Sequence, residues 1–100
     1  MYIAMNRFRI APGREDVFES LWRERNSHLH AVPGFREFHL LRGEPGDEFT
    51  LFVSHSLWDS RQAFAAWTES DAFRKAHGQA RSPEGTLLGH PQFEGFEVVL

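Results

Sequence analysis

The chain has 100 residues and a formal net charge of −3, which predicts a single domain over residues 1–100 with one modest core. It has no cysteine, which excludes disulfides, zinc–thiolate sites and cysteine nucleophiles, and its scattered basic residues argue against a nucleic-acid-binding surface. No apolar run reaches the length of a membrane span and the start has no secretory signal pattern, so we expect a cytoplasmic protein without membrane contact.

The first predicted element is a strand over residues 2–10. Its alternation places Asn6 in the middle of an otherwise apolar face, together with Tyr2, Ala4, Phe8 and Ile10. The other face of this strand carries Ile3 and Met5. A helix over residues 14–30 follows the strand, with Trp22 on its apolar stripe and Arg25 beside that stripe.

The middle of the chain predicts a hairpin. Residues 35–42 and 49–58 read as strands, and the Gly- and Pro-containing stretch 43–47 between them favours a turn. A helix over residues 61–69 follows, with Phe64 and Trp67 on its apolar stripe.

Ser70-Asp71 is a second capping point, which predicts a separate shorter helix through about Gln79. That helix carries Phe73 and His77 one turn apart. A single straight helix would hold Trp67 and His77 about 15 Å apart, so a shared site requires the break. Residues 80–92 predict a long loop and residues 93–100 a last strand.

The element order β-α-β-β-α-β predicts an α+β protein with the ferredoxin-like fold, in which both helices cover one face of a four-stranded antiparallel sheet. The other face is left bare, although Ile3 and Met5 make it apolar. We therefore expect a homodimer in which two sheets close into an α+β barrel.

Four segments resemble a known family. Residues 5–8 (MNRF), 32–35 (VPGF), 58–67 (WDSRQAFAAW) and 70–77 (SDAFRKAH) resemble motifs of the antibiotic biosynthesis monooxygenase (ABM) superfamily. The match is best to its Isd-type haem-degrading branch, because the last of these segments ends in a histidine, His77, at the spacing that this branch has. The resemblance implies a single ABM domain in a dimeric barrel.

The resemblance also implies the chemistry. Haem is both cofactor and substrate, and with O2 and an external electron donor, either a reductase or a small reductant, the ring is opened to a bilin and iron is released. The implied active-site residues are Asn6, Trp67 and His77, with His77 as the axial ligand of the haem iron. Asn6 would donate a hydrogen bond to oxygen, and Trp67 would press on the haem plane.

Further contacts with haem are predicted around these three residues. Phe64, Phe73 and Trp22 are candidate pocket walls. Arg25 is a candidate for binding a haem propionate, as are Arg23, Arg74, Lys75 and Arg81.

Other interpretations stay open. Considered without the motifs, Trp67 would be a residue of the core, and Asn6 would be a buried amide that is hydrogen-bonded to the backbone or to a helix residue. His77 would be a helix-end residue that interacts with the helix dipole. A cofactor-free monooxygenase acting on a quinol or polycyclic phenol would have the same fold. A haem carrier without turnover and a plain dimerisation module are further alternatives.

Overall fold

The computed structural model describes residues 1–24, 29–71, 73–74 and 85–100. Its elements in chain order are β1 (Tyr2–Ile10), α1 (Glu15–Glu24), the short 3-10 helix η1 (Leu29–Ala31), β2 (Phe35–Pro45), β3 (Thr50–Trp58), α2 (Arg61–Thr68) and β4 (Gln92–Glu97). Neither described helix has the length and apolarity that a membrane span requires.

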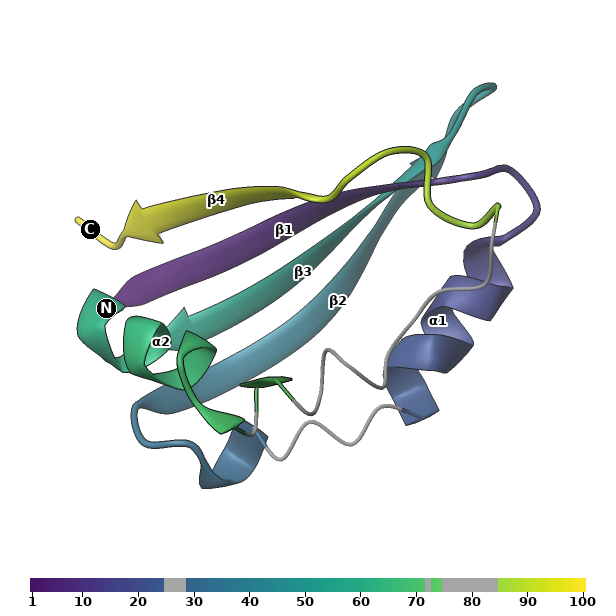
Figure 1. The fold of residues 1–100 in the computed structure, drawn as a ribbon. Coiled ribbons are helices and arrows are strands. Elements are labelled where there is room, and N and C mark those ends of the chain that lie inside the picture. Colours follow the sequence, from purple (N-terminus) through teal and green to yellow (C-terminus); the bar gives the residue numbers. More distant parts are fainter. Residues whose placement is uncertain (25–28, 72, 75–84) are drawn as a thin grey trace.

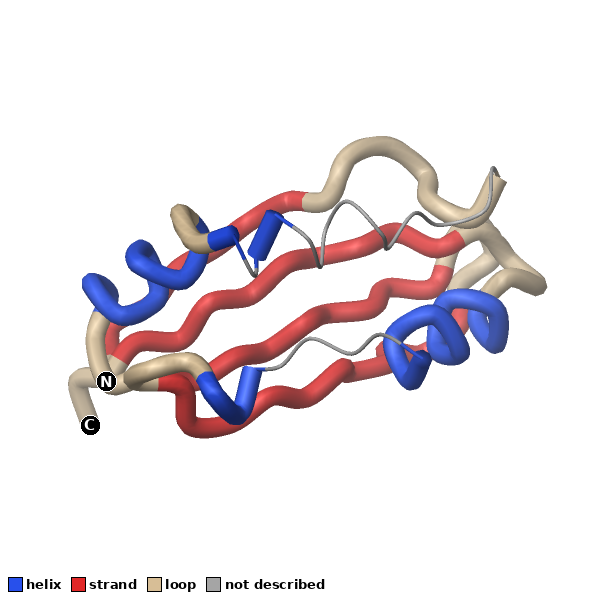
Figure 2. The backbone as a smooth tube through the Cα atoms, turned by 60° about the horizontal axis from the view of Figure 1, so that its bottom comes forward, coloured by secondary structure: helices blue, strands red, loops and turns tan. Residues whose placement is uncertain are grey.

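The four strands form one antiparallel sheet in the order β2-β3-β1-β4. Both helices lie on the same face of this sheet (Figure 1), which confirms the predicted ferredoxin-like α+β architecture. Figure 2 shows that α1 and α2 lie over opposite ends of the sheet and leave the middle of the sheet between them.

The predicted alternation of β1 is confirmed. Tyr2, Ala4 and Ile10 are buried under the helices, and Asn6 lies on the same face. Two core clusters result, one at each end of the sheet. The first contains Tyr2, Ala4, Leu29 and Trp58, and the second contains Ile10, Phe18 and Phe52.

Three predicted boundaries were wrong. Strand β2 runs to Pro45 rather than residue 42, because its pairing with β3 shifts register after Arg42 and resumes between Pro45 and Thr50. The turn between the two strands is therefore shorter than predicted. The helical conformation of α1 is described only to Glu24, and residues 29–31 are 3-10 rather than α-helical. Strand β4 ends at Glu97 because β1 begins at Tyr2, so the chain beyond Val98 has no strand to pair with.

No described helix lies on the opposite face of the sheet (Figure 1). Strand register places seven apolar side chains on it, and Leu41 and Phe96 are 46% and 44% exposed. The seven side chains, which we call the open sheet face, are Ile3, Met5, Leu41, Leu51, Val53, Leu57 and Phe96.

Candidate active site

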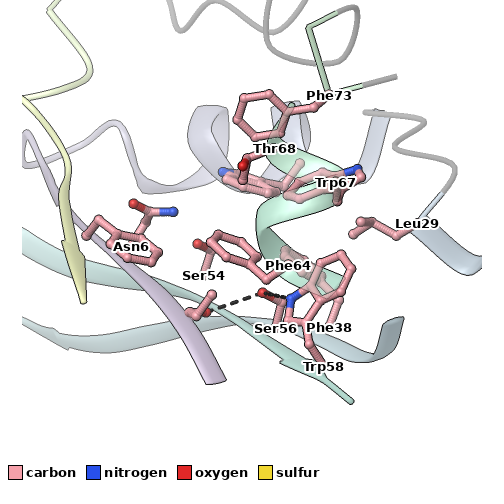
Figure 3. A pocket seen from close by; sticks show the side chains of 13 residues that line it. Asn6, Leu29, Phe38, Ser54, Ser56, Trp58, Phe64, Trp67, Thr68 and Phe73 are labelled. Carbon is pink, nitrogen blue, oxygen red and sulfur yellow. Dashed lines mark hydrogen bonds between the residues drawn. The ribbon is translucent and has the colours of Figure 1, made fainter. Parts of the chain in front are cut away.

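A cavity of about 500 Å³ lies between the helices and the middle of the sheet. Its walls are largely aromatic and come from five different elements, namely Trp22 of α1, Phe38 of β2, Trp58 of β3, Phe64 and Trp67 of α2, and Phe93 of β4. Figure 3 shows four of these rings, those of Phe38, Trp58, Phe64 and Trp67. Phe73 adds a further ring. Cavities of roughly 300–1,000 Å³ with apolar walls are typical of small-molecule sites.

Asn6 is the one amide among the described residues that line the cavity. It is half-buried at the centre of β1, where its strand neighbours are Ser54 of β3 and Phe93 of β4. Figure 3 shows its amide directed into the cavity. Within the described part of the chain its side chain makes no hydrogen bond, so the NH2 group is available to a ligand.

Trp67 is held by rings on three sides. Its indole lies 5.4 Å from that of Trp58, 6.1 Å from the ring of Phe64 and 4.7 Å from the ring of Phe73, measured between centroids. The helix that carries Trp67 is defined locally, because the Ser60 side chain accepts a hydrogen bond from the Ala63 backbone N–H at 3.1 Å. The position of the Trp67 ring is thus set by both its helix and its neighbours.

The chain breaks its helical path at Ser70, as predicted. Helix α2 ends at Thr68, and the Ser70 hydroxyl donates to the Trp67 carbonyl at 2.6 Å and accepts from the Phe73 N–H at 3.2 Å. This is the geometry of a new N-cap. The turn places the Phe73 ring edge-on against Trp67.

The wall on the α1 side is a second aromatic pair. Trp22 stacks on Phe38 with ring centroids 5.4 Å apart and planes inclined by 21°. Trp22 also meets Phe18 and Phe8 edge-on, which ties it to the second core cluster. The cavity therefore has rigid aromatic walls toward both helices, a shape suited to a flat apolar ligand.

Five of the predicted site residues line this one cavity, namely Asn6, Trp22, Phe64, Trp67 and Phe73. His77 and Arg25 lie outside the described residues, as do Lys75 and Arg81. The two remaining cationic candidates do not line the cavity: Arg23 pairs with Glu19 at 3.5 Å and Arg74 with Asp71 at 3.8 Å.

Sequence reasoning missed Phe38, Ser54, Ser56 and Phe93 as cavity residues. Phe93 lies beside Asn6 across β1 and β4 and stacks on Phe64 at 5.6 Å. The available signal was the alternation of the last strand, but the pairing register that decides its face is a non-local property.

The described histidines, His30, His39, His55 and His90, lie away from the cavity wall. Among the residues that the structure describes, no three His, Cys, Asp or Glu side chains form a group that could hold a metal ion.

Residues 1–79 match the family model described as antibiotic biosynthesis monooxygenase. The chain belongs to this family. The predicted resemblance to its haem-degrading branch is also confirmed, since a "heme oxygenase (mycobilin-producing)" of Mycobacterium tuberculosis is 33% identical over 98 residues, which cover 98% of this chain and 89% of the relative. A "heme-degrading monooxygenase" of Listeria monocytogenes is 39% identical over 51 residues, covering 50% of this chain and 42% of that protein.

Two solved structures share the fold of this chain. The heme-degrader MhuD of Mycobacterium tuberculosis, with two hemes bound in its active site, superposes with a TM-score of 0.78 at 28% identity, covering 100% of this chain and 97% of MhuD. The cofactor-independent oxygenase SnoaB of Streptomyces nogalater superposes with a TM-score of 0.69 at 21% identity, covering 99% and 93%, which shows a shared fold alone.

Proposed function

We propose that this chain is a haem-degrading monooxygenase that binds haem in the cavity between the sheet and the two helices. The observation that carries the proposal is that Asn6 and Trp67, two of the three residues implied by the haem-branch motifs, line one aromatic cavity. The similarity to heme-degrading relatives supports it, because the strongest of these matches covers nearly the whole chain.

The cavity fits the chemical character of the ligand. A porphyrin is a flat apolar ring that needs apolar surface on both sides and an axial ligand for its iron. The aromatic walls supply the apolar surface. His77, the third motif residue, is the proposed axial ligand, and Arg25 is a proposed partner of a propionate, since guanidinium groups pair well with carboxylates.

Bound haem supplies an iron atom that activates oxygen and is itself the molecule oxidised. The protein contributes position and polarity around it. Asn6 would present an amide N–H to the reacting oxygen in a cavity whose described walls are largely aromatic, where a positioned donor has a large effect. Trp67 presents a fixed indole that sets how a flat ring lies in the cavity. An external donor, a reductase or a small reductant, supplies the electrons for O2 and the products are a bilin and iron.

The test is a haemin titration followed by reduction. Wild-type protein should give a sharp Soret band, and His77→Ala should lose it, whereas His90→Ala, which replaces an exposed histidine outside the cavity wall, should keep it. Adding ascorbate in air, with catalase present to remove free peroxide, should bleach the band and release iron to a ferrous chelator.

Three results would overturn the proposal. If haemin binds this protein no more tightly than it binds an unrelated protein, haem is not the ligand of the cavity. Haemin that binds but survives reductant in air identifies a carrier. Oxygen uptake with a polycyclic phenol in the absence of haemin identifies a cofactor-free monooxygenase of the same fold.

A further inference from the structure

A hydrogen-bonded serine lies beneath the aromatic wall on the α2 side. The Trp58 indole N–H donates to the Ser56 hydroxyl oxygen at 2.9 Å, and the Ser56 hydroxyl donates to the Ala4 carbonyl at 3.3 Å (Figure 3). The bond to Ala4 joins β3 to β1, because Ser56 pairs with Ala4 across these strands, whereas the bond from Trp58 lies within β3. Each hydroxyl function of Ser56, donor and acceptor, is therefore used.

The indole held by this serine cannot take another partner without moving. Trp58 is fully buried, with 0% exposure, so its N–H has no access to water. Its ring is also fixed from the sides, where Phe35 and Phe64 meet it edge-on at 5.6 Å each. The Ser56 hydroxyl and these two rings together hold the Trp58 indole in its rotation, and the hydroxyl is the polar partner of its N–H.

Trp58 is in turn the surface on which Trp67 lies. The two indoles have centroids 5.4 Å apart and planes inclined by 32°. Because close-packed rings transmit small displacements, a change in the Trp58 plane must change the Trp67 plane or open a void. A series of contacts therefore runs from the sheet through Ser56 and Trp58 to the face that Trp67 presents to the cavity.

We propose that Ser56 is a positioning residue that sets the plane of the Trp67 indole through Trp58. The inference rests on the proposed function in one respect only, namely that Trp67 faces the bound haem. In the haem-loaded protein, the plane of the Trp67 indole would set which edge of the haem ring lies nearest the Asn6 amide. Ser56 would thereby influence which ring carbon is oxidised.

The first measurement uses the protein without haem. Two indoles this close, with inclined planes, couple their electronic transitions and give a paired positive and negative band in far-ultraviolet circular dichroism. Trp67→Phe should abolish this couplet, and Ser56→Ala should reduce it strongly, while Ser56→Thr, which keeps the hydroxyl, should restore it. Ser54→Ala is the matched control, because it removes a hydroxyl from the same face of β3 that makes no bond to Trp58. An unchanged couplet in Ser56→Ala overturns the inference.

The second measurement uses the haem-loaded protein and follows products. Ser56→Ala should bind haemin with nearly wild-type affinity, turn it over about tenfold more slowly and give a mixture of bilin isomers where the wild type gives one pattern. Trp58→Phe, which removes the N–H but keeps a ring, should give the same mixture and serves if Ser56→Ala folds poorly. Ser56→Thr should restore the wild-type pattern, which a mere loss of stability would not explain.

The two failures are distinguishable. If wild-type protein does not bind haemin, the proposed function fails, while the couplet still decides whether Ser56 sets the Trp67 plane. If wild-type protein degrades haemin and Ser56→Ala gives the same couplet and the same bilin pattern, the positioning role fails and the proposed function stands.

Discussion

Asn6 has an unusual place for an amide. It lies at the centre of a strand face whose other members are Tyr2, Ala4, Phe8 and Ile10, and its side chain bonds no described residue. Asn6 is only half-buried, so its amide reaches the cavity, where a ligand can accept a hydrogen bond from it. This supports a role for the NH2 group as a donor in the reaction.

We expect Asn6→Ala to retain haemin binding and to lower the rate of haem degradation by about 100-fold, the typical cost of removing one donor to a reacting oxygen. Asn6→Leu is the sharper variant, because it has nearly the same size and shape but no hydrogen-bond donor. Single-turnover absorption changes after addition of ascorbate measure the rate. Full activity in Asn6→Leu would show that the donor is not required.

The site residues differed in how far the sequence could place them. Asn6 and Trp67 were placed from strand alternation, a helical stripe and the family motifs, all of which are local patterns. Ser54 and Phe93 were missed, although they flank Asn6 directly, because strand register brings them there from positions far along the chain. Ser56 was missed for a further reason, since only the rotation of Trp58 reveals its hydrogen bond.

At the scale of elements, the break between α2 and the turn that follows it shapes the cavity. The capping serines Ser60 and Ser70 each hold a backbone N–H three residues ahead, at 3.1 Å and 3.2 Å. Such caps are local, and the one at Ser70 was predicted from the sequence. The predicted ends of β2 and β4 were wrong because strand ends depend on the length of the neighbouring strand.

Ser70→Ala should destabilise the protein by about 1 kcal/mol, the usual cost of a lost N-cap, and should also loosen Phe73 from Trp67. Ser60→Ala is the matched control, because it removes the cap of α2 at similar cost but leaves the contact between Ser70 and Phe73 intact. Urea unfolding measures stability for both. Haemin affinity should fall more in Ser70→Ala, and an equal fall in the two variants would contradict a specific role for the break.

At the scale of the whole molecule, the two faces of the sheet have different environments. One face packs under α1 and α2, while the open sheet face carries seven apolar side chains with no described element over it. An uncovered apolar surface of this kind in a small domain is typical of an interaction surface. The bare face was predicted from the alternation of β1 alone, because once both helices lie on one side the other side follows from the period of two.

We propose that a second copy of the chain covers the open sheet face, so that two sheets form a barrel. Wild-type protein should then have twice the chain mass of 11.6 kDa in sedimentation equilibrium. Leu57→Asp places a carboxylate between Ile3 and Glu37 on the open sheet face and should give a folded monomer, because neither strand neighbour could pair with the buried charge in the dimer. Val17→Asp on α1, which covers the other face, is the matched control and should remain dimeric. A wild-type chain that sediments as a monomer at all concentrations would contradict the proposal, and a dimeric Leu57→Asp would place the contact elsewhere.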